Sequence, residues 1–229
     1  MKRVLLVAVL FSWCCARPPA NTRELVPWAW ERREDLRFVS GEVAYLAETI
    51  ELRGGTTNVL RRRQPLLVTD PHRLTPVIRI ETHRASLTDT QRHAAADAIA
   101  ALGSQRVQID FDATHSERTF YAALLRDLHR TIPHITITAL ASWCSDDRWL
   151  AGLPIDDAIP MLFQMGTDDR LIRARLARGE DLAEPRCRAS AGISLMEIPP
   201  RLPPRQRIYV FNARPWSPHD WRRAEEMVR

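Results

Sequence analysis

The chain has 229 residues, of which 45% are hydrophobic and 27% are charged, and this balance argues against a disordered protein. The formal net charge is +5, but nearly all of the positive charge is arginine scattered among acids, so we expect no nucleic-acid partner. The length fits one large domain or two small ones.

The first residues have the pattern of an export signal. A basic start precedes an apolar run, Val4 to Trp13, that is too short to span a bilayer. We therefore predict a periplasmic or secreted protein with a signal peptide over 1–16, a linker over 17–26 and a single domain over 27–229. Lipidation at Cys14 or Cys15 is the alternative, and a lipid anchor is the one membrane contact we would then expect.

Eight strand-like segments follow. Clusters of β-branched and aromatic residues between turn residues predict strands at 28–30, 43–52, 75–83, 107–113, 135–143, 156–165, 189–195 and 207–212. Helical spacing of apolar residues predicts helices at 88–102, 117–130, 168–179 and 218–229. The remaining connections favour a short helix after Trp30, an extended excursion or small hairpin over 53–74, and a proline-rich loop over 198–207.

Strands and helices that alternate in this order predict an α/β protein. The expected fold is a small (β/α)8 TIM-like barrel in which loops replace some helices. An open doubly wound sheet is the runner-up, but no glycine-rich phosphate loop follows the first predicted strand. In a barrel, the outward side chains of each strand meet the helices, and the inward ones line the interior and the active-site end.

Charge lies on the inward phase of two neighbouring strands. In the segment VQIDFDATHSER the outward phase is apolar, and the inward phase carries Gln108, Asp110 and Asp112. The strand before it repeats the pattern with Arg79 and Glu81. Because unpaired buried charge is costly, we expect Arg79 to pair with Asp110 and leave Asp112 and Glu81 at the rim.

Two carboxylates at a barrel rim are the groups that glycoside cleavage requires, one as acid and one as nucleophile or base. We assign Asp112, Glu81 and Asp110 to the candidate catalytic site, with Arg79 and Gln108 as supporting residues. Two further carboxylates, Glu48 and Glu117, are predicted near the same end. The position of Glu117 in a first helical turn is also explained by the helix dipole.

Aromatic residues are predicted at the same rim. Trp30, Trp143 and Trp216 each end a strand or open the loop beyond it, and Tyr209 lies within a strand. Each alone also fits a hydrophobic core. Three tryptophans at one rim favour a sugar-binding surface, so the expected partner is a glycan or cell-envelope polysaccharide.

Metal chemistry is an alternative. His115 near Asp110 and Asp112 resembles the ligand set of a metal-dependent polysaccharide deacetylase. Only His83 and His72 lie nearby as a second histidine, and neither has a convincing strand-end position, so we assign no metal and no cofactor.

The mature chain retains two cysteines, Cys144 and Cys187. The first follows the end of the fifth predicted strand and the second precedes the seventh, which places them at opposite ends of the barrel. That separation exceeds the Cα limit of about 7 Å for a disulfide. We therefore expect two unpaired thiols.

Several phrases of the sequence resemble a known family. The phrases QIDFDA, SER and FY within residues 108–121, together with ITALASWC at 137–144, are similar to a bacterial family of exported proteins classed only as a domain of unknown function. The likeness covers most of the mature chain. It implies a barrel similar to glycoside hydrolases, with Asp110 and Asp112 at the end of the fourth strand, and no proven activity.

One departure from a related motif bears on catalysis. The DFD phrase also looks like the DxDxE motif of chitinase-type glycosidases, but Thr114 stands where that motif has its catalytic glutamate. A non-catalytic envelope protein that uses the barrel for binding or scaffolding is therefore the alternative from a different functional class.

Overall fold

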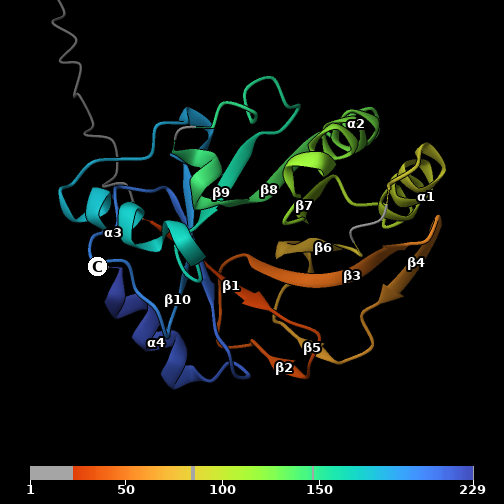
Figure 1. Ribbon diagram of the computed structural model, residues 1–229. Coiled ribbons are helices and arrows are strands. Elements are labelled where there is room, and N and C mark those ends of the chain that lie inside the picture. Colours follow the sequence, from red (N-terminus) through yellow and green to blue (C-terminus); the bar gives the residue numbers. More distant parts are fainter. Residues whose placement is uncertain (1–22, 84–85, 146, 229) are drawn as a thin grey trace, which may run out of the picture.

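The computed structural model describes residues 23–83, 86–145 and 147–228, and its centre is a closed barrel of eight parallel strands (Figure 1). In chain order these are β1 (Glu24–Ala29), β3 (Val43–Arg53), β6 (Leu74–Thr82), β7 (Arg106–Asp110), β8 (His134–Leu140), β9 (Asp157–Met161), β10 (Ser190–Ser194) and β11 (Arg207–Phe211). Strand β1 pairs with both β11 and β3, which closes the ring. The predicted α/β class and TIM-like barrel are confirmed; the predicted signal peptide lies outside the described residues.

Four α-helices lie in the described part of the chain, in the four places predicted: α1 (Asp89–Ala100), α2 (Arg118–Leu128), α3 (Asp169–Ala177) and α4 (Pro218–Met227). Their first turns follow the expected chemistry. Thr88 and Gln91 form a reciprocal capping box at α1, and Ser217 caps α4 just before Pro218. Helices α1 and α2 lie side by side over one flank of the barrel (Figure 1).

The connections without α-helices are short or extended. Two small strands, β2 (Glu34–Asp35) and β5 (Leu66–Leu67), pair with each other in parallel, and β4 (Thr56–Arg61) forms an antiparallel hairpin with β3. The hairpin predicted over 53–74 is therefore confirmed. The short helix predicted after Trp30 is wrong, because Glu34 and Leu36 bond to the backbone of the β5 segment and hold this stretch extended.

The barrel has an outer and an inner apolar layer. On the outside, the outward side chains of β6, β7 and β8 pack against α1 and α2, for example Phe111 against Tyr121 with ring centroids 5.0 Å apart. The predicted outward phase of β7 is thereby confirmed. The inside is filled by a separate cluster from β1, β3, β6, β9 and β11, made of Val26, Trp28, Ala44, Val77, Ile159, Tyr209 and Phe211.

The ring has a narrow seam between β1 and β3. The first strand was expected at Trp28–Trp30, but it begins at Glu24 because Glu24 to Pro27 align with β11. Only two residue pairs join β1 to β3, whereas nine join β3 to β6. Beyond the seam, β4 rather than β1 pairs with the last six residues of β3.

Cys144 and Cys187 form a disulfide with their Cα atoms 5.9 Å apart, so the prediction of unpaired thiols is wrong. The chain from α3 to β10 passes over the outer face of β9 on its way to the next strand. There the backbone N–H of Glu184 donates to the carbonyl of Cys144, and Arg186 donates to the carbonyls of Leu153 and Ile155. This segment covers a flank that no α-helix covers, and it brings the two cysteines together.

Candidate functional site

The inward side chains at the C-terminal strand ends form what we call the barrel mouth. Its polar side consists of inward side chains on β3, β6 and β7, together with one residue that lies two positions after β7. These residues are Glu51, Arg79, Glu81, Asp110 and Asp112. Its apolar side comes from β8, β9, β11 and the residues that follow β1 and β9: Trp30, Leu140, Met161, Phe163 and Phe211. Strand register explains the polar side, because Glu51 pairs with Glu81 and Arg79 pairs with Asp110, and paired residues share a face.

Arg79 is the centre of the polar side. Its Nε donates to Glu81 Oε1 at 2.8 Å, and its Nη1 lies 3.7 Å from Asp110 Oδ2. The same guanidinium sits over the Trp30 ring, 5.8 Å from the ring centroid. The predicted contact between Arg79 and Asp110 is present, and Arg79 links the polar and aromatic sides of the mouth.

Asp110 lies at the end of β7 with its side chain only 14% exposed. Burial raises the pKa of Asp110 to about 6, and the neighbouring carboxylates Asp112 and Glu81 add to the shift. A hydrogen bond of 2.8 Å from Thr138 Oγ1 and the charge of Arg79 act in the opposite direction. Asp110 therefore exchanges its proton near neutral pH.

Asp112 has a different environment. It lies two residues beyond the end of β7, its side chain is exposed, and it forms no hydrogen bond or ion pair with any described residue. Partial desolvation by the surrounding protein raises its pKa, and the charge of Arg79 works against this. Two carboxylates on one strand end therefore differ in exposure and in hydrogen-bond and ion-pair partners.

The apolar side is a connected set of rings. Trp28 and Trp30 stack with centroids 5.5 Å apart, and Phe211 lies 4.1 Å from Trp28 and 4.9 Å from Phe163. Trp28 and Phe211 are buried, whereas Trp30 and Phe163 are half-buried. Trp30 thus lies at the rim where the sequence placed it, with part of its ring open to the mouth.

Two predicted residues lie deeper in the barrel. Gln108 is fully buried one inward position below Asp110, and neither atom of its side-chain amide has a hydrogen-bond partner among the described residues. Tyr209 is also buried, two residues before Phe211 on β11, and burial raises the pKa of its hydroxyl. Tyr209 faces the opposite, N-terminal end, where it lines a pocket with Glu42 and Arg207.

The two additional carboxylates do not reach the mouth. A β-bulge between Leu46 and Glu48 reverses the phase of β3, so Glu48 lies on the outer face and pairs with Arg61 at 3.0 Å. Burial raises the pKa of Glu48, and the Arg61 contact opposes this. Glu117 accepts hydrogen bonds from the Thr114 backbone N–H and the Thr82 hydroxyl, which makes it a capping residue of the β7–α2 turn.

Two of the three tryptophans are part of the core. Trp143 follows β8 in a 3-10 turn, Ala141–Cys144, and packs edge-to-face on Trp149 outside the barrel, where it borders a separate pocket of about 720 Å³. Trp216 is buried beneath α4, and its Nε1 donates to the Trp28 carbonyl at 3.0 Å. The expectation of three tryptophans at one rim is therefore wrong for both, because the chain turns away from the mouth before each one.

Several residues in or beside the mouth were missed from the sequence, and three of them are instructive. Glu51 enters the inward phase only because of the bulge in β3. Thr138 lies on the inward phase of β8, and the alternation in ITITAL was a readable signal for it. Phe211 is two residues after Tyr209 on β11 and shares its inward phase, but a single phenylalanine near a strand end is indistinguishable from core.

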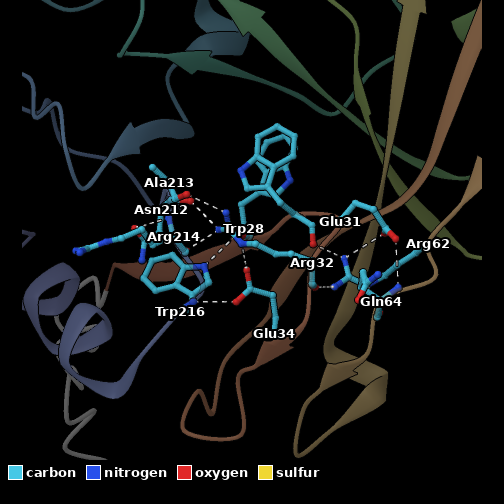
Figure 2. A network of polar contacts seen from close by, with 11 residues as sticks. Trp28, Glu31, Arg32, Glu34, Arg62, Gln64, Asn212, Ala213, Arg214 and Trp216 are labelled. Atoms are coloured by element: carbon cyan, nitrogen blue, oxygen red, sulfur yellow. Dashed lines mark hydrogen bonds and ion pairs between the residues drawn. The ribbon is translucent and has the colours of Figure 1, made fainter.

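A polar network holds the Trp30 side of the mouth in place (Figure 2). Arg32 Nε donates to Glu34 at 2.6 Å, and its Nη atoms donate to the carbonyls of the three residues after β11, Asn212, Ala213 and Arg214. The other Glu34 oxygen accepts from the Trp216 backbone N–H at 2.8 Å.

Arg62, just after β4, donates to the carbonyls of Trp30 and Arg32. Figure 2 shows these side chains converging from three loops, which fixes the backbone that carries Trp30.

Within residues 23–83, 86–145 and 147–228, no group of three or more His, Cys, Asp or Glu side chains is arranged to hold a metal ion. No helix in these ranges has the length and apolar character that a bilayer crossing requires. The ligand set considered around His115 is thus not assembled by the described residues.

Comparison of the chain with protein-family models, with curated proteins and with solved structures found no match. The resemblance noted from the sequence phrases therefore stays a prediction. The functional argument rests on the geometry of the barrel mouth.

Proposed function

We propose that this protein binds a carbohydrate chain of the cell envelope across the barrel mouth. The observation that carries the proposal is the pairing of half-buried rings, Trp30 and Phe163, with carboxylates on the facing strands. A sugar ring has apolar faces that pack on aromatic rings and hydroxyl groups that donate to carboxylates. The C-terminal end of a parallel barrel is also where enzymes of this architecture hold their ligands.

Glycoside cleavage is a second proposal, and the environment of Asp110 supports it. A carboxyl group with a pKa of about 6 can donate a proton to a leaving oxygen near neutral pH. Exposed Asp112 would then serve as the second carboxylate that this chemistry requires. Among the three carboxylates grouped from the sequence, Asp110 is thus the acid in this proposal.

We also propose a relationship to glycoside-hydrolase barrels and a location outside the cytoplasm. Helices follow β6, β7, β9 and β11, as expected for a (β/α)8 barrel in which loops replace the other helices, similar to glycoside-hydrolase barrels. The disulfide between Cys144 and Cys187 supports an oxidising compartment, in agreement with the signal-like residues 1–16. We propose a periplasmic or secreted protein on these grounds.

Calorimetric titration of the purified protein with envelope oligosaccharides tests the binding proposal. Wild type should bind a glycan, and Trp30→Ala should weaken binding by about tenfold or more, because a half-buried stacking surface is lost. Asp89→Asn is the matched control, since Asp89 lies in α1 with its side chain 85% exposed. Unchanged affinity in Trp30→Ala, with the fold intact by circular dichroism, would contradict the proposed site.

Product analysis tests cleavage on the same ligand. Asp110→Asn should still bind the glycan but release no shortened product, because the variant has no proton to donate. Product formation at the wild-type rate by Asp110→Asn would refute the catalytic proposal and leave binding as the function.

A further inference from the structure

The barrel mouth carries an excess of negative charge. Its described residues include four carboxylates, Glu51, Glu81, Asp110 and Asp112, against one guanidinium, Arg79, which leaves three net negative charges when all are ionised. Glu51 accepts a hydrogen bond from Asn58 at 3.1 Å, a contact that leaves its charge in place. His83, just after β6, and His115, three residues beyond Asp112, are both exposed.

Among the described residues, the one guanidinium of the mouth is already engaged. Arg79 contacts Glu81 and Asp110 and lies 5.8 Å from the centroid of the Trp30 ring. An anionic sugar would have to compete with two carboxylates for this guanidinium and would meet Asp112 as well. Asp112, by contrast, has an exposed carboxylate with no partner among the described residues, so a cationic group can approach it without breaking a contact.

Buried polar atoms beneath the mouth point independently to a ligand. Gln108 is 0% exposed with both amide atoms unpaired, and Trp28 is 0% exposed with its Nε1 unpaired among the described residues. Both side chains lie on the inward phase, Gln108 below Asp110 and Trp28 against Trp30. A buried polar group without a partner is costly, so these atoms require water or a polar ligand as their partner. The amide nitrogen of Gln108 and the Trp28 Nε1 are hydrogen-bond donors, and the Gln108 amide oxygen is an acceptor. A hydroxyl group can both accept and donate a hydrogen bond, so it suits this set of atoms.

We infer that the ligand of the barrel mouth is a cationic oligosaccharide, a chain of sugars with free amino groups. The ammonium groups face Asp112 and Glu81, the sugar rings pack on Trp30 and Phe163, and hydroxyl groups reach toward Gln108. Ammonium groups are also attracted to the exposed faces of aromatic rings, which the apolar side supplies. This inference rests on the proposed glycan-binding function and adds the charge of the substrate to it.

Three hexasaccharides of equal length separate the charge of the sugar from its shape. Calorimetric titration of the purified protein near neutral pH would use the hexamers of glucosamine, of N-acetylglucosamine and of galacturonic acid, which are cationic, neutral and anionic. We expect the glucosamine hexamer to bind about tenfold or more tightly than the neutral one, and its advantage to shrink at high salt. Asp112→Asn should reduce that advantage several-fold, and Asp89→Asn should leave it intact.

Each outcome decides a different point. Equal affinity for the cationic and neutral hexamers, or tighter binding of the anionic one, would overturn the inference and leave the proposed glycan function in place. An advantage for glucosamine that Asp112→Asn does not reduce would overturn the placement of the ammonium group. Binding of none of the three hexamers would overturn the inference and count against the proposed function as well.

Discussion

Asp110 and Asp112 are two residues apart on the same face of the chain, yet their surroundings differ. Asp110 is mostly buried, accepts a hydrogen bond from Thr138 and contacts Arg79. Asp112 is exposed beyond the end of β7. Burial, more than the neighbouring charges, separates the two carboxyl groups, because removing water penalises the charged form of Asp110 most strongly.

This difference predicts how Asp110→Asn changes stability with pH. The pKa of Asp110 rises from its ordinary 3.8 to about 6 in the folded protein, so the folded state holds a proton that the unfolded chain releases. The wild-type free energy of unfolding therefore falls as pH rises from about 4 to about 6 and stays reduced above that. Asparagine removes this penalty, so the variant should exceed wild type by on the order of 1–3 kcal/mol at about pH 7.5.

Urea denaturation across this pH range is the measurement. The advantage of Asp110→Asn should shrink below about pH 6 and disappear well below the ordinary pKa of 3.8, where wild-type Asp110 is protonated in both the folded and the unfolded state. Asp89→Asn, which changes an exposed carboxylate, should show no such trend. An Asp110→Asn difference that is independent of pH would contradict the assigned shift.

At the residue scale, the sequence predicted Arg79, Glu81, Asp110 and Asp112 correctly as a group, because alternation along β6 and β7 is unbroken. It failed for Glu48 and Glu51. One extra residue in β3 exchanges the inward and outward phases, and nothing in VAYLAETIEL marks where the bulge falls.

Among the elements, side chains reinforce the closure of the ring. Two residue pairs join β1 to β3, and Arg62, just after β4, donates across this seam to the carbonyls of Trp30 and Arg32. Arg32 donates to Glu34 and to three backbone carbonyls after β11. Glu34 is 1% exposed, so its carboxylate depends on these polar partners. The charged stretch after Trp30 was expected to form a short helix, but its partners lie in distant segments that the local sequence does not show.

Arg32→Met should therefore destabilise the protein. The change leaves the buried Glu34 carboxylate without its guanidinium and should lower the free energy of unfolding by about 3 kcal/mol. Arg37→Met is the matched control, because Arg37 pairs with Asp35 two residues away and both side chains are largely exposed, at 62% and 46%. Exposed pairs are screened by water and salt, so this variant should unfold close to wild type.

Urea denaturation of both variants gives the comparison. Equal free energies of unfolding for Arg32→Met and Arg37→Met would show that the network contributes no more than a surface ion pair. A loss confined to Arg32→Met, with an unchanged denaturant slope, would locate the effect in the folded state.

At the scale of the whole molecule, the eight barrel strands and the four α-helices of the described residues were readable in order from the sequence, because each carries its own periodicity. The disulfide was not. Its cysteines were assigned to opposite barrel ends from the strands they adjoin, but the connection from α3 to β10 runs outside β9 and brings Cys187 to Cys144. The path of a loop across a barrel surface depends on tertiary packing, which local sequence patterns do not report.

The disulfide predicts a response to reduction. It joins residues 43 positions apart, and a cross-link of that span restricts the unfolded chain by about 4 kcal/mol. Reductant should lower the free energy of unfolding by about that amount, and the double variant Cys144→Ser, Cys187→Ser should be equally destabilised and insensitive to reductant. If reductant changes neither stability nor the denaturant midpoint of wild type, the disulfide contributes little to the fold.

Closure of the ring also sets an order of events during synthesis. The first barrel strand, β1, finds its main partner in the last one, β11, and the Arg32 network ties the same two ends together. A ribosome releases β1 long before it has made residues 207–211, so the cylinder cannot close until nearly the whole chain has emerged. Until then both edges of the growing sheet remain unpaired, and we expect a nascent chain that depends on chaperones to prevent edge-to-edge association.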